Sequence, residues 1–349
     1  MAIITEGKAK INVTLQKIVS KDMPVFYNPV MESNRTISII LLNCVDKKEM
    51  WIGLPLEASG IRGIRFLKEL EKGKIKNINF NDYDKDAVKS IKDNLKLNKI
   101  KLSSKIKISC EEANIFLLNS SGFDYIDIDP FGTPNPFLDS AVKRISRKGV
   151  IAVTATDTSA LCGTYKDACL RKYWAIPLRN EIMHEIGLRI LIRKCQLIGA
   201  QFEKALIPIF SYSKEHYMRV FFLCEKGKKF VDGVLGQHKM FNSAGPLWLG
   251  KLWESALAEK MFDYFKKELN NTKKISSKEK ETLRLLEKIR DESRINSTGF
   301  YHIPSLTKKY KFKDTPKQAE IIDKIRKEGY LASETHFKEN SIRSDISEK

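Results

Sequence analysis

The stretch from Met50 to Asp82, MWIGLPLEASGIRGIRFLKELEKGKIKNINFND, contains the pattern that decides the fold. Its first part, MWIGLPLE, reads as a strand, IRGIRFLKELEKG reads as a helix, and IKNINFND reads as a second strand. Two strands separated by a helix of this length are typical of a parallel pair with a crossover connection. We therefore expect an α/β fold with its first parallel pair in this stretch.

The same alternation continues beyond Asp82. Further strands are predicted at KIKISCEEA, FDYIDIDP and GVIAVTATD, with helices at PFLDSAVKRI and at KDAVKSIKDNLKLNK, the latter capped by Asp84 or Asp86. Short apolar strands of this kind are expected in a sheet that is covered on both faces. ALIPIFSYSKEHYMRVFFLCEKG predicts two more strands, which we expect to be antiparallel and to close the sheet. The fold class is therefore α/β, with a Rossmann-like, mostly parallel sheet.

The flanking segments have other patterns. Residues 1–34 contain a strand pair that includes INVTL and a loop, VFYNPVMESN, and a helix is predicted from Arg35 to about Val45. Residues 167–198 have helical periodicity, whereas KGKKFVDGVLGQHKMFNSAGPLWLG is glycine-rich and expected to be loop-like. Two helices are predicted over 251–293, and a small basic α/β or winged module follows. The change in composition places a domain boundary near residue 250.

The charge balance indicates the kind of partner. The chain has 62 Lys and Arg against 43 Asp and Glu, a formal charge of +19, which favours a polyanion. An anionic membrane surface is the alternative, but no apolar run approaches the ~20 residues that span a bilayer. The N-terminus lacks the apolar core of a signal peptide. None of the six cysteines forms a CxxC pair, so we expect buried thiols in a reducing cytoplasm and no metal site.

Ligands of open α/β sheets bind beyond the carboxyl ends of the strands, so the residues at those ends are candidate site residues. In SGIRG, small residues allow a ligand to approach the backbone, although a tight turn is the alternative. Asp82, 22 residues beyond Gly60, suits ribose hydroxyls or a helix cap. In SCEEAN, Glu112 and the amide of Ala113 suit adenine, with Glu111 as the competitor. Together these ends predict an adenosine pocket, for a dinucleotide or for S-adenosylmethionine.

The end of the YIDID strand favours the second of these ligands. There Asp129 is followed by Pro130 and Phe131, an arrangement suited to methyl transfer to an exocyclic amine. Such an amine is a poor nucleophile because its lone pair is delocalised into the ring, and a carboxylate that accepts its N–H bonds prepares it for attack. Proline stiffens the turn, and an aromatic ring can stack on the base for ~1–3 kcal/mol. Asp127, on the same face of the strand, is either a second acid of the site or a structural group.

The longer segment YIDIDPFGTPNPFLDSA resembles the signature of the tRNA (guanine(26)-N(2))-dimethyltransferases of the archaeal type. The likeness continues in the family's order through VFYNP, SGIRGIRF, VTATD, CLRKYWAIPLRNEIMHEIGLRIL, HYMRVF, GPLWLG and ASETHF. It implies a cytoplasmic class I S-adenosylmethionine-dependent methyltransferase that methylates N(2) of guanosine 26 in tRNA twice. It further implies a methyltransferase domain over 1–250 and a C-terminal tRNA-binding domain over 251–349; we also expect no membrane partner and a monomer.

The resemblance also implies roles for individual residues. Those that would bind the cofactor are Arg35, Arg62, Asp82, Glu112 and Ala113. Asp129 would be the catalytic carboxylate, Pro130 and Phe131 would shape the pocket, and Phe26 would be the second face of an aromatic sandwich around a flipped guanine. Read without the family, Phe26 is only an apolar anchor for its loop.

Two features depart from the family pattern. Leu54 stands where the family usually has an acidic residue, so either Glu57 takes over the interaction with the methionine amino group or this interaction is absent. Some family members have a four-cysteine zinc site in a segment that contains no cysteine here, so no zinc is expected.

Two rival functions stay open. They are methylation of an adenine amine, which the DPFG sequence disfavours, and RNA binding without catalysis, which only Leu54 supports.

The substrate implied by the family sets a further expectation. A guanine stacked inside tRNA cannot reach a pocket, so we expect the base to be flipped out and the tRNA to be recognised by its shape and phosphates. The basic residues expected to contact phosphates are Lys143, Arg144, Arg147, Lys148, Arg171, Lys172 and the lysines from Lys308 to Lys317.

Overall fold

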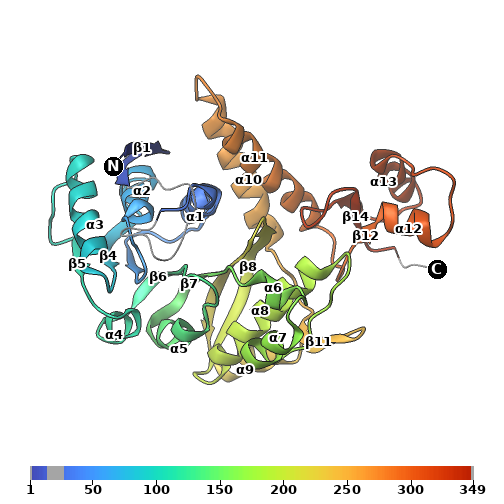
Figure 1. Cartoon of the computed structure of the whole chain (residues 1–349), viewed down its shortest axis with the longest axis horizontal. Coiled ribbons are helices and arrows are strands. Elements are labelled where there is room, and N and C mark those ends of the chain that lie inside the picture. The colour runs from blue at the N-terminus through green and yellow to red at the C-terminus, as the bar shows by residue number, and fades with distance from the viewer. Residues whose placement is uncertain (1, 14–26, 347–349) are drawn as a thin grey trace. The chain divides into compact units, whose positions relative to one another are not determined.

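The computed structural model describes residues 2–13 and 27–346 (Figure 1). Phe26 lies outside the described residues. The chain forms two compact units that interleave in sequence. The first consists of Met1–Ala155, Ile198–Ile207 and Phe221–Val231, and the second of Thr156–Leu197, Pro208–Val220 and Asp232–Lys349. Residue 250, where the composition changes, lies inside the second unit.

A seven-stranded sheet with the order β5-β4-β3-β6-β7-β9-β8 is the centre of the fold. Its strands are β3 (Met50–Leu54), β4 (Ile75–Asn81), β5 (Ile106–Ser109), β6 (Phe123–Ile128), β7 (Ile145–Ala155), β8 (Lys204–Lys214) and β9 (Tyr217–Lys226). Strands β3 to β7 pair in parallel, and β8 and β9 close the sheet as antiparallel strands, as predicted. The strand order reverses between β3 and β6, and ligands of doubly wound sheets bind at such a point.

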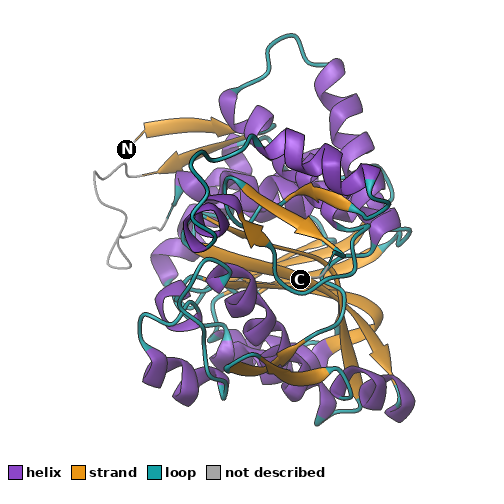
Figure 2. Cartoon of the chain, turned by 90° about the vertical axis from the view of Figure 1, so that its right-hand side faces the viewer, coloured by secondary structure: helices purple, strands orange, loops and turns teal. Residues whose placement is uncertain are grey.

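Helices cover both faces of the parallel strands (Figures 1 and 2). They are α1 (Glu32–Cys44), α2 (Ile61–Glu69), α3 (Lys85–Leu97), α4 (Ala113–Leu118) and α5 (Asn135–Arg144). In Figure 1, α2 and α3 lie above the strands and α4 and α5 below them. The carboxylate of Asp84 caps α3, which decides between the two candidate caps. Ile52, Ile78 and Ile126 are completely buried, as expected for strands covered on both faces. An antiparallel hairpin of β1 (Ala2–Glu6) and β2 (Ala9–Val13) precedes them.

The segment predicted to be loop-like after residue 227 is instead structured. It forms α9 (Lys228–Leu235) and a hairpin of β10 (His238–Phe241) and β11 (Ala244–Trp248). Val231 and Val234, three residues apart, are buried on one face of α9, and a Cβ at Gly233 would contact nothing, so this glycine is tolerated. Asn242 supplies the positive φ, 53°, that the hairpin turn requires. The loop prediction was wrong because it weighed the glycines above this apolar spacing.

The other helices of the second half are α6 (Thr158–Leu161), α7 (Lys166–Tyr173), α8 (Met183–Ala200), α10 (Ser255–Asn270) and α11 (Ser277–Glu292). Apart from the short α6, which was not predicted, they match their predictions with one interruption. The helical stretch predicted over 167–198 is divided because Trp174 adopts a left-handed conformation, with φ 56°, and ends α7. Among the described residues, no helix is long and apolar enough to cross a membrane, and no three His, Cys, Asp or Glu are grouped as metal ligands.

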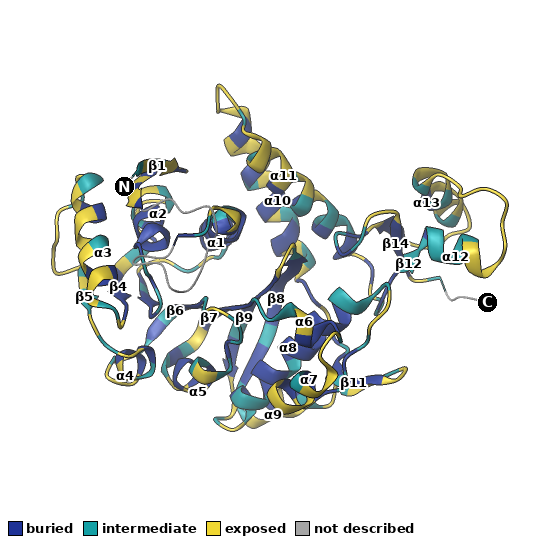
Figure 3. Ribbon diagram, in the orientation of Figure 1, coloured by how far each residue is buried: buried dark blue, intermediate teal, exposed yellow. Residues whose placement is uncertain are grey.

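The last part of the chain is a small α/β module. A sheet of order β12-β14-β13 combines β12 (Tyr301–His302), β13 (Ala332–Glu334) and β14 (Ser341–Ser344) with α12 (Ile303–Lys309) and α13 (Gln318–Lys327). Its small core consists of Ile303, Ile322, Ala332 and Ile342. The connection between the two helices and most of α13 are exposed (Figure 3).

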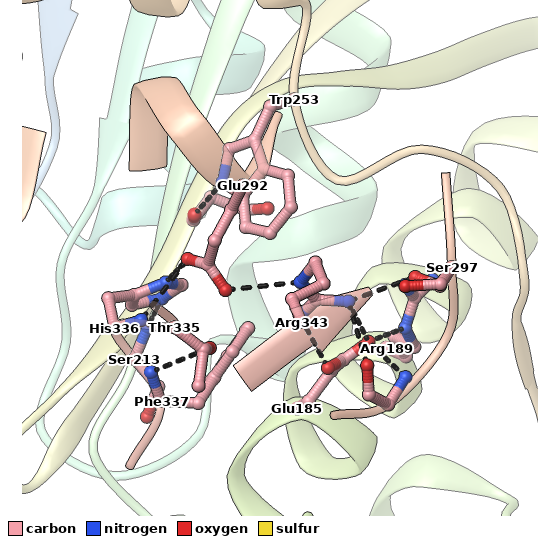
Figure 4. A network of polar contacts seen from close by, with 12 residues as sticks. Glu185, Arg189, Ser213, Trp253, Glu292, Ser297, Thr335, His336, Phe337 and Arg343 are labelled. Carbon is pink, nitrogen blue, oxygen red and sulfur yellow. Dashed lines mark hydrogen bonds and ion pairs between the residues drawn. The ribbon is translucent and has the colours of Figure 1, made fainter. Parts of the chain in front are cut away.

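A buried ionic network holds this module to earlier helices of the same unit (Figure 4). Arg343 of β14 donates from Nη2 to Glu185 Oε2 of α8 at 2.6 Å and from Nε to Glu292 Oε1 of α11 at 3.1 Å. Glu292 also contacts His336 Nδ1 at 2.5 Å. Burial alone would raise the pKa of Glu185, but Arg343 and Arg189 lower it to about 2. Because Arg343 and both glutamates are fully buried, each charge depends on its partners rather than on water.

Candidate cofactor site and active site

The loop after β3 folds tightly against the end of β4. The backbone N–H of Glu57 donates to Asn81 O at 3.0 Å, and that of Gly60 donates to Glu57 O at 2.9 Å. Gly60 begins α2 with φ 77°, a conformation that favours glycine. A Cβ at Gly63 would lie 2.2 Å from the Phe80 ring. Glycine is therefore favoured at position 60 by the backbone conformation and at position 63 by close packing.

Asp82 follows β4 directly and supports this loop. Its Oδ2 accepts the N–H of Ala58 at 2.8 Å, and its Oδ1 accepts the N–H of Asp84 at 3.1 Å. Burial raises the pKa of the carboxyl. Asp84, rather than Asp82, caps α3, so the cap alternative does not apply. Each carboxylate oxygen has a second lone pair, so both can still accept a ligand hydroxyl.

The two acids after β5 differ in what they bind. Glu112 is the N-cap of α4 and accepts the N–H groups of Asn114 and Ile115 at 2.8 and 3.1 Å, while Ala113 is buried. The backbone of Glu111 is held by the Asn81 side chain. Its Oε2 is buried and has no hydrogen-bond partner among the described residues. Glu111 therefore offers the free acceptor at this strand end, whereas Glu112 serves its own helix.

Arg62 of α2 organises the acids at the end of β6. Its Nη2 pairs with Asp129 Oδ2, and its Nη1 lies 3.2 Å from Asp127 Oδ2. Asn34 Oδ1 accepts from both Nη atoms at 3.1 Å, and Ser38 Oγ accepts from Nη1 at 3.2 Å. Arg62 is thus a buried organiser of the site and not a solvated helix charge.

The two aspartates of YIDID have different surroundings. The hydroxyl of Tyr125 donates to Asp127 Oδ2 at 2.5 Å, and Asp127 is almost fully buried. The Asp129 side chain keeps 16% of its surface exposed, and among the described residues only its Oδ2 has a contact, to Arg62. These contacts favour Asp127 as a structural group and leave Asp129 Oδ1 open. Beside it, the Phe131 side chain is half-exposed.

Arg35 of α1 is committed to a different partner. It donates from Nε and Nη2 to the two carboxylate oxygens of Glu6 at 2.7 and 2.5 Å, and to Asn28 O at 3.1 Å. Burial alone would raise the pKa of Glu6, but Arg35 and Arg65 lower it to about 2. The structure therefore places Arg35 in an ion pair that fastens the N-terminal hairpin to α1.

Glu57 is a carboxyl group without a full set of partners. It is 6% exposed, and its Oε2 is buried with no hydrogen-bond partner in the described part of the chain. Burial raises its pKa to about 8; Arg62 opposes this shift, while Asp127 adds to it. Leu54, where the family usually has an acid, is an apolar core residue.

Sequence reasoning missed the polar residues that hold Arg62 in place. Asn34 and Ser38 lie four residues apart on α1, so they share one face of the helix. Their positions around the apolar stretch ISIILL were the available signal, because a polar pair in a buried helix requires a partner.

Several of the basic residues expected to bind phosphates pair with carboxylates. Ion pairs join Lys143 to Asp139 at 2.6 Å, Arg147 to Glu225 at 3.8 Å and Lys172 to Asp157 at 3.2 Å. These basic side chains are exposed, but only Lys143 and Asp139 form a pair that is exposed on both sides and therefore contributes little to stability.

The parallel sheet, its reversal between β3 and β6, and the polar residues at its strand ends define a class I S-adenosylmethionine-dependent methyltransferase, as expected. The model of the family described as N2,N2-dimethylguanosine tRNA methyltransferase matches residues 7–241 and 235–349. The chain belongs to this family, which confirms the resemblance found in the sequence.

Individual relatives resemble the chain over nearly its whole length. The tRNA (guanine(26)-N(2)/guanine(27)-N(2))-dimethyltransferase of Aquifex aeolicus (strain VF5) is 39% identical, covering 99% of this chain and 94% of the relative. The tRNA (guanine(26)-N(2))-dimethyltransferase of Methanocaldococcus jannaschii is 36% identical, covering 99% and 96%. The solved structure of Trm1 from Pyrococcus horikoshii with S-adenosyl-L-methionine is 33% identical, has a TM-score of 0.88 and covers 99% of this chain and 97% of that chain.

Proposed function

We propose that this chain transfers methyl groups from S-adenosylmethionine to N(2) of guanosine 26 in tRNA, giving first monomethyl- and then dimethylguanosine. The relatives with this activity in their names, 36–39% identical over 99% of the chain, support the reaction. The observation that carries the proposal is Asp129, a carboxylate at the switch point of the sheet with one oxygen on Arg62 and the other without a partner among the described residues. A cytoplasmic location and tRNA as the partner follow from this reaction.

Asp129 is proposed as the catalytic carboxylate. Arg62 fixes Oδ2, so that Oδ1 can accept an N–H of the guanine amine and orient the nitrogen towards the methyl donor. This contact holds the nucleophile in position, and positioning provides a large share of such catalysis. The monomethylated amine still has one N–H, so the same contact serves the second transfer.

Phe131 is proposed to stack on the flipped guanine, because its half-exposed side chain follows Asp129 by two residues. Pro130 stiffens the turn between them. Phe26 is proposed as the opposite face, and it lies outside the described residues. Extruding the base costs a few kcal/mol, and stacking of the base between two aromatic rings would offset this cost.

The residues at the strand ends fit the proposed cofactor. Glu57 Oε2 and Glu111 Oε2 are buried acceptors without partners among the described residues, and they follow β3 and β5. Buried acceptors of this kind need a donor, and S-adenosylmethionine has donors on its amino group, ribose and adenine. When bound, this cofactor supplies an electrophilic methyl group on a sulfonium.

The strand-end residues are proposed to contact this ligand directly, whereas the two arginines would order the groups around it. Asp82 would accept from the ribose, and Ala113 with Glu111 or Glu112 would contact the adenine. Glu57 would bind the amino group in place of the acid that Leu54 replaces, because its buried Oε2 has no other donor in the described part of the chain. Arg62 would hold Asp129 and Asp127 in place, and Arg35 would order the N-terminal hairpin.

The test is to incubate unmodified tRNA with the enzyme and labelled cofactor and to map the product nucleotide by nuclease digestion and mass spectrometry. We expect dimethylguanosine at position 26, and the name of the Aquifex aeolicus relative makes position 27 the second site to inspect. Methylated adenine would favour the rival methyltransferase. Calorimetry that detects no cofactor binding would favour an RNA-binding protein without catalysis.

A further inference from the structure

The end of α12 and the connection from it to α13 combine aromatic rings with lysines. We call residues 308–317, KKYKFKDTPK, the lysine–aromatic segment. Every residue in it is exposed (Figure 3), and Tyr310 and Phe312 expose 49% and 65% of their surfaces. Large apolar rings usually bury most of their surface, so two neighbouring exposed rings call for a ligand or a partner as explanation.

The backbone of this segment is held although its side chains are in solvent. The N–H groups of Tyr310 and Phe312 donate to Leu306 O at 2.9 Å and Thr307 O at 3.0 Å, which ends α12 in a fixed turn. The two ring centroids lie 6.4 Å apart, with the planes inclined at 51°. The rings therefore do not stack on each other, and Lys309 Nζ lies over the Tyr310 ring, 5.1 Å from its centroid.

The charge of the segment selects an anionic ligand. It contains the five lysines Lys308, Lys309, Lys311, Lys313 and Lys317 and a single acid, Asp314. Lys317 pairs with Glu320 at 3.9 Å, which is a weak contact between exposed side chains. Helix α13 adds Lys324, Arg326 and Lys327 nearby in the sequence.

An RNA strand fits this composition better than a membrane surface does. Binding in a membrane interface requires a helix with an unpartnered apolar face. Here Ile322 of α13 and Ile303 of α12 are buried together with Ala332 and Ile342 in the core of the module. What remains exposed is aromatic and cationic, the combination by which proteins bind unpaired nucleotides through base stacking and phosphate contacts.

We propose that the lysine–aromatic segment binds unpaired nucleotides of the RNA substrate, with Tyr310 and Phe312 stacking on bases and the lysines contacting phosphates. This inference rests on the proposed function and adds a second binding site to it, built from residues other than those that hold the flipped guanine. Stacking accepts any base, so the segment adds affinity without sequence preference.

The test uses the full-length chain and steady-state methylation of unmodified tRNA over a series of salt concentrations. We expect Tyr310→Ala and Phe312→Ala each to raise KM for tRNA about fivefold or more, with kcat, the cofactor affinity and the salt slope unchanged. Lys311→Gln with Lys313→Gln should instead reduce the salt slope by ~0.7 for each phosphate that is no longer neutralised. Phe230→Ala, at an exposed ring of 46% beside two lysines on α9, is the matched control and should leave KM unchanged.

Phe312→Leu separates stacking from ordinary apolar contact, because leucine keeps the apolar bulk but has no aromatic face. A Leu variant or an Ala double variant with the wild-type KM would overturn the proposal, provided that the melting temperatures match. A transcript without its 3′ single-stranded end locates the nucleotides bound, since the Ala effect disappears if the segment binds that end and persists if it binds a loop.

Direct binding keeps this proposal separate from the proposed function. If the wild-type chain fails to methylate tRNA, the proposed function fails, but a gel shift with tRNA and with a single-stranded adenosine oligonucleotide still tests the segment. We expect weaker binding of both RNAs by the Tyr310→Ala, Phe312→Ala double variant. If the double variant bound both RNAs as tightly as the wild type but lost binding to anionic vesicles, the RNA assignment would be overturned in favour of a membrane.

Discussion

Replacing Glu57 by glutamine should stabilise the protein and weaken its cofactor binding at the same time. The Glu57 carboxyl is 6% exposed, and its Oε2 has no partner in the described residues. Burial raises its pKa from 4.5 to about 8, since the attraction of Arg62 is insufficient while Asp127 repels the charge. Arg35 also lowers the pKa of Glu57, but it is engaged with Glu6. Glutamine has a similar shape and no proton to lose.

The size of the effect follows from the two pKa values. Above pH 4.5 the unfolded chain releases the Glu57 proton, whereas the folded chain retains it until about pH 8. The unfolded state therefore binds fewer protons, and stability falls as the pH rises through this window. At ~1.4 kcal/mol per pH unit the loss is about 3 kcal/mol at pH 7, an upper limit because surrounding groups relax. Glu57→Gln removes this loss.

Urea unfolding without cofactor at pH 5 and pH 8 measures the difference. We expect the wild type and Glu57→Gln to agree within ~1 kcal/mol at pH 5, and the variant to be more stable by about 4 kcal/mol at pH 8. Glu71→Gln, at an exposed glutamate, is the control and should follow the wild type at both values. Parallel pH profiles for the wild type and Glu57→Gln would refute the assignment of a raised pKa.

Cofactor binding gives the second half of this prediction. If the cofactor's ammonium meets Glu57, binding ionises the carboxyl, so calorimetry in two buffers of different ionisation enthalpy should show proton release near pH 7. The variant should release no such proton and bind about tenfold or more weakly, the range for removal of a charge-assisted hydrogen bond. An unchanged Kd would show that the ammonium lies elsewhere.

Three further outcomes follow from the structure. Asp129→Asn should abolish both methylations and leave the cofactor Kd, measured by calorimetry, within about threefold of the wild-type value. Asp124→Asn, at the opposite end of β6, is the control. A normal yield of dimethylguanosine from Asp129→Asn would contradict the role of Asp129. Arg343→Met should lower the free energy of unfolding by about 3–5 kcal/mol in urea, because it leaves the buried Glu185 and Glu292 without their shared partner, and a change below ~1 kcal/mol would refute this. The affinity for tRNA should fall steeply with salt, with a log–log slope set by several displaced counterions, and a flat dependence would argue against phosphate recognition.

The repeating pattern of the sheet could be predicted because it is local. Each strand and its following helix lie within about thirty residues, and the hydrophobic period together with a cap such as Asp84 marks their ends. The strand ends could single out Asp129 as a candidate for the same reason, since the rule about carboxyl ends requires only the strand assignments.

The parts that could not be predicted depend on contacts between distant positions. Arg62 and Asp129 are 67 residues apart, and nothing in either segment indicates their pairing. The sequence also does not show that Glu112, rather than Glu111, caps α4. Arg343 and Glu185 are 158 residues apart, and two fully buried charges cannot be told from surface charges by spacing alone.

The interleaving of the two units decides how this protein can be dissected. A cut at residue 250, the natural choice from composition, yields a first fragment with all of the first unit but only part of the second. That fragment retains Glu185 and lacks both Glu292 and Arg343, so it carries a buried carboxylate whose main counterion is on the other piece. Neither fragment is then an independent module. Loss of activity in a truncated chain would therefore indicate misfolding first, rather than the loss of a contact with tRNA. Single substitutions in the intact chain are the sounder way to divide chemistry from RNA recognition.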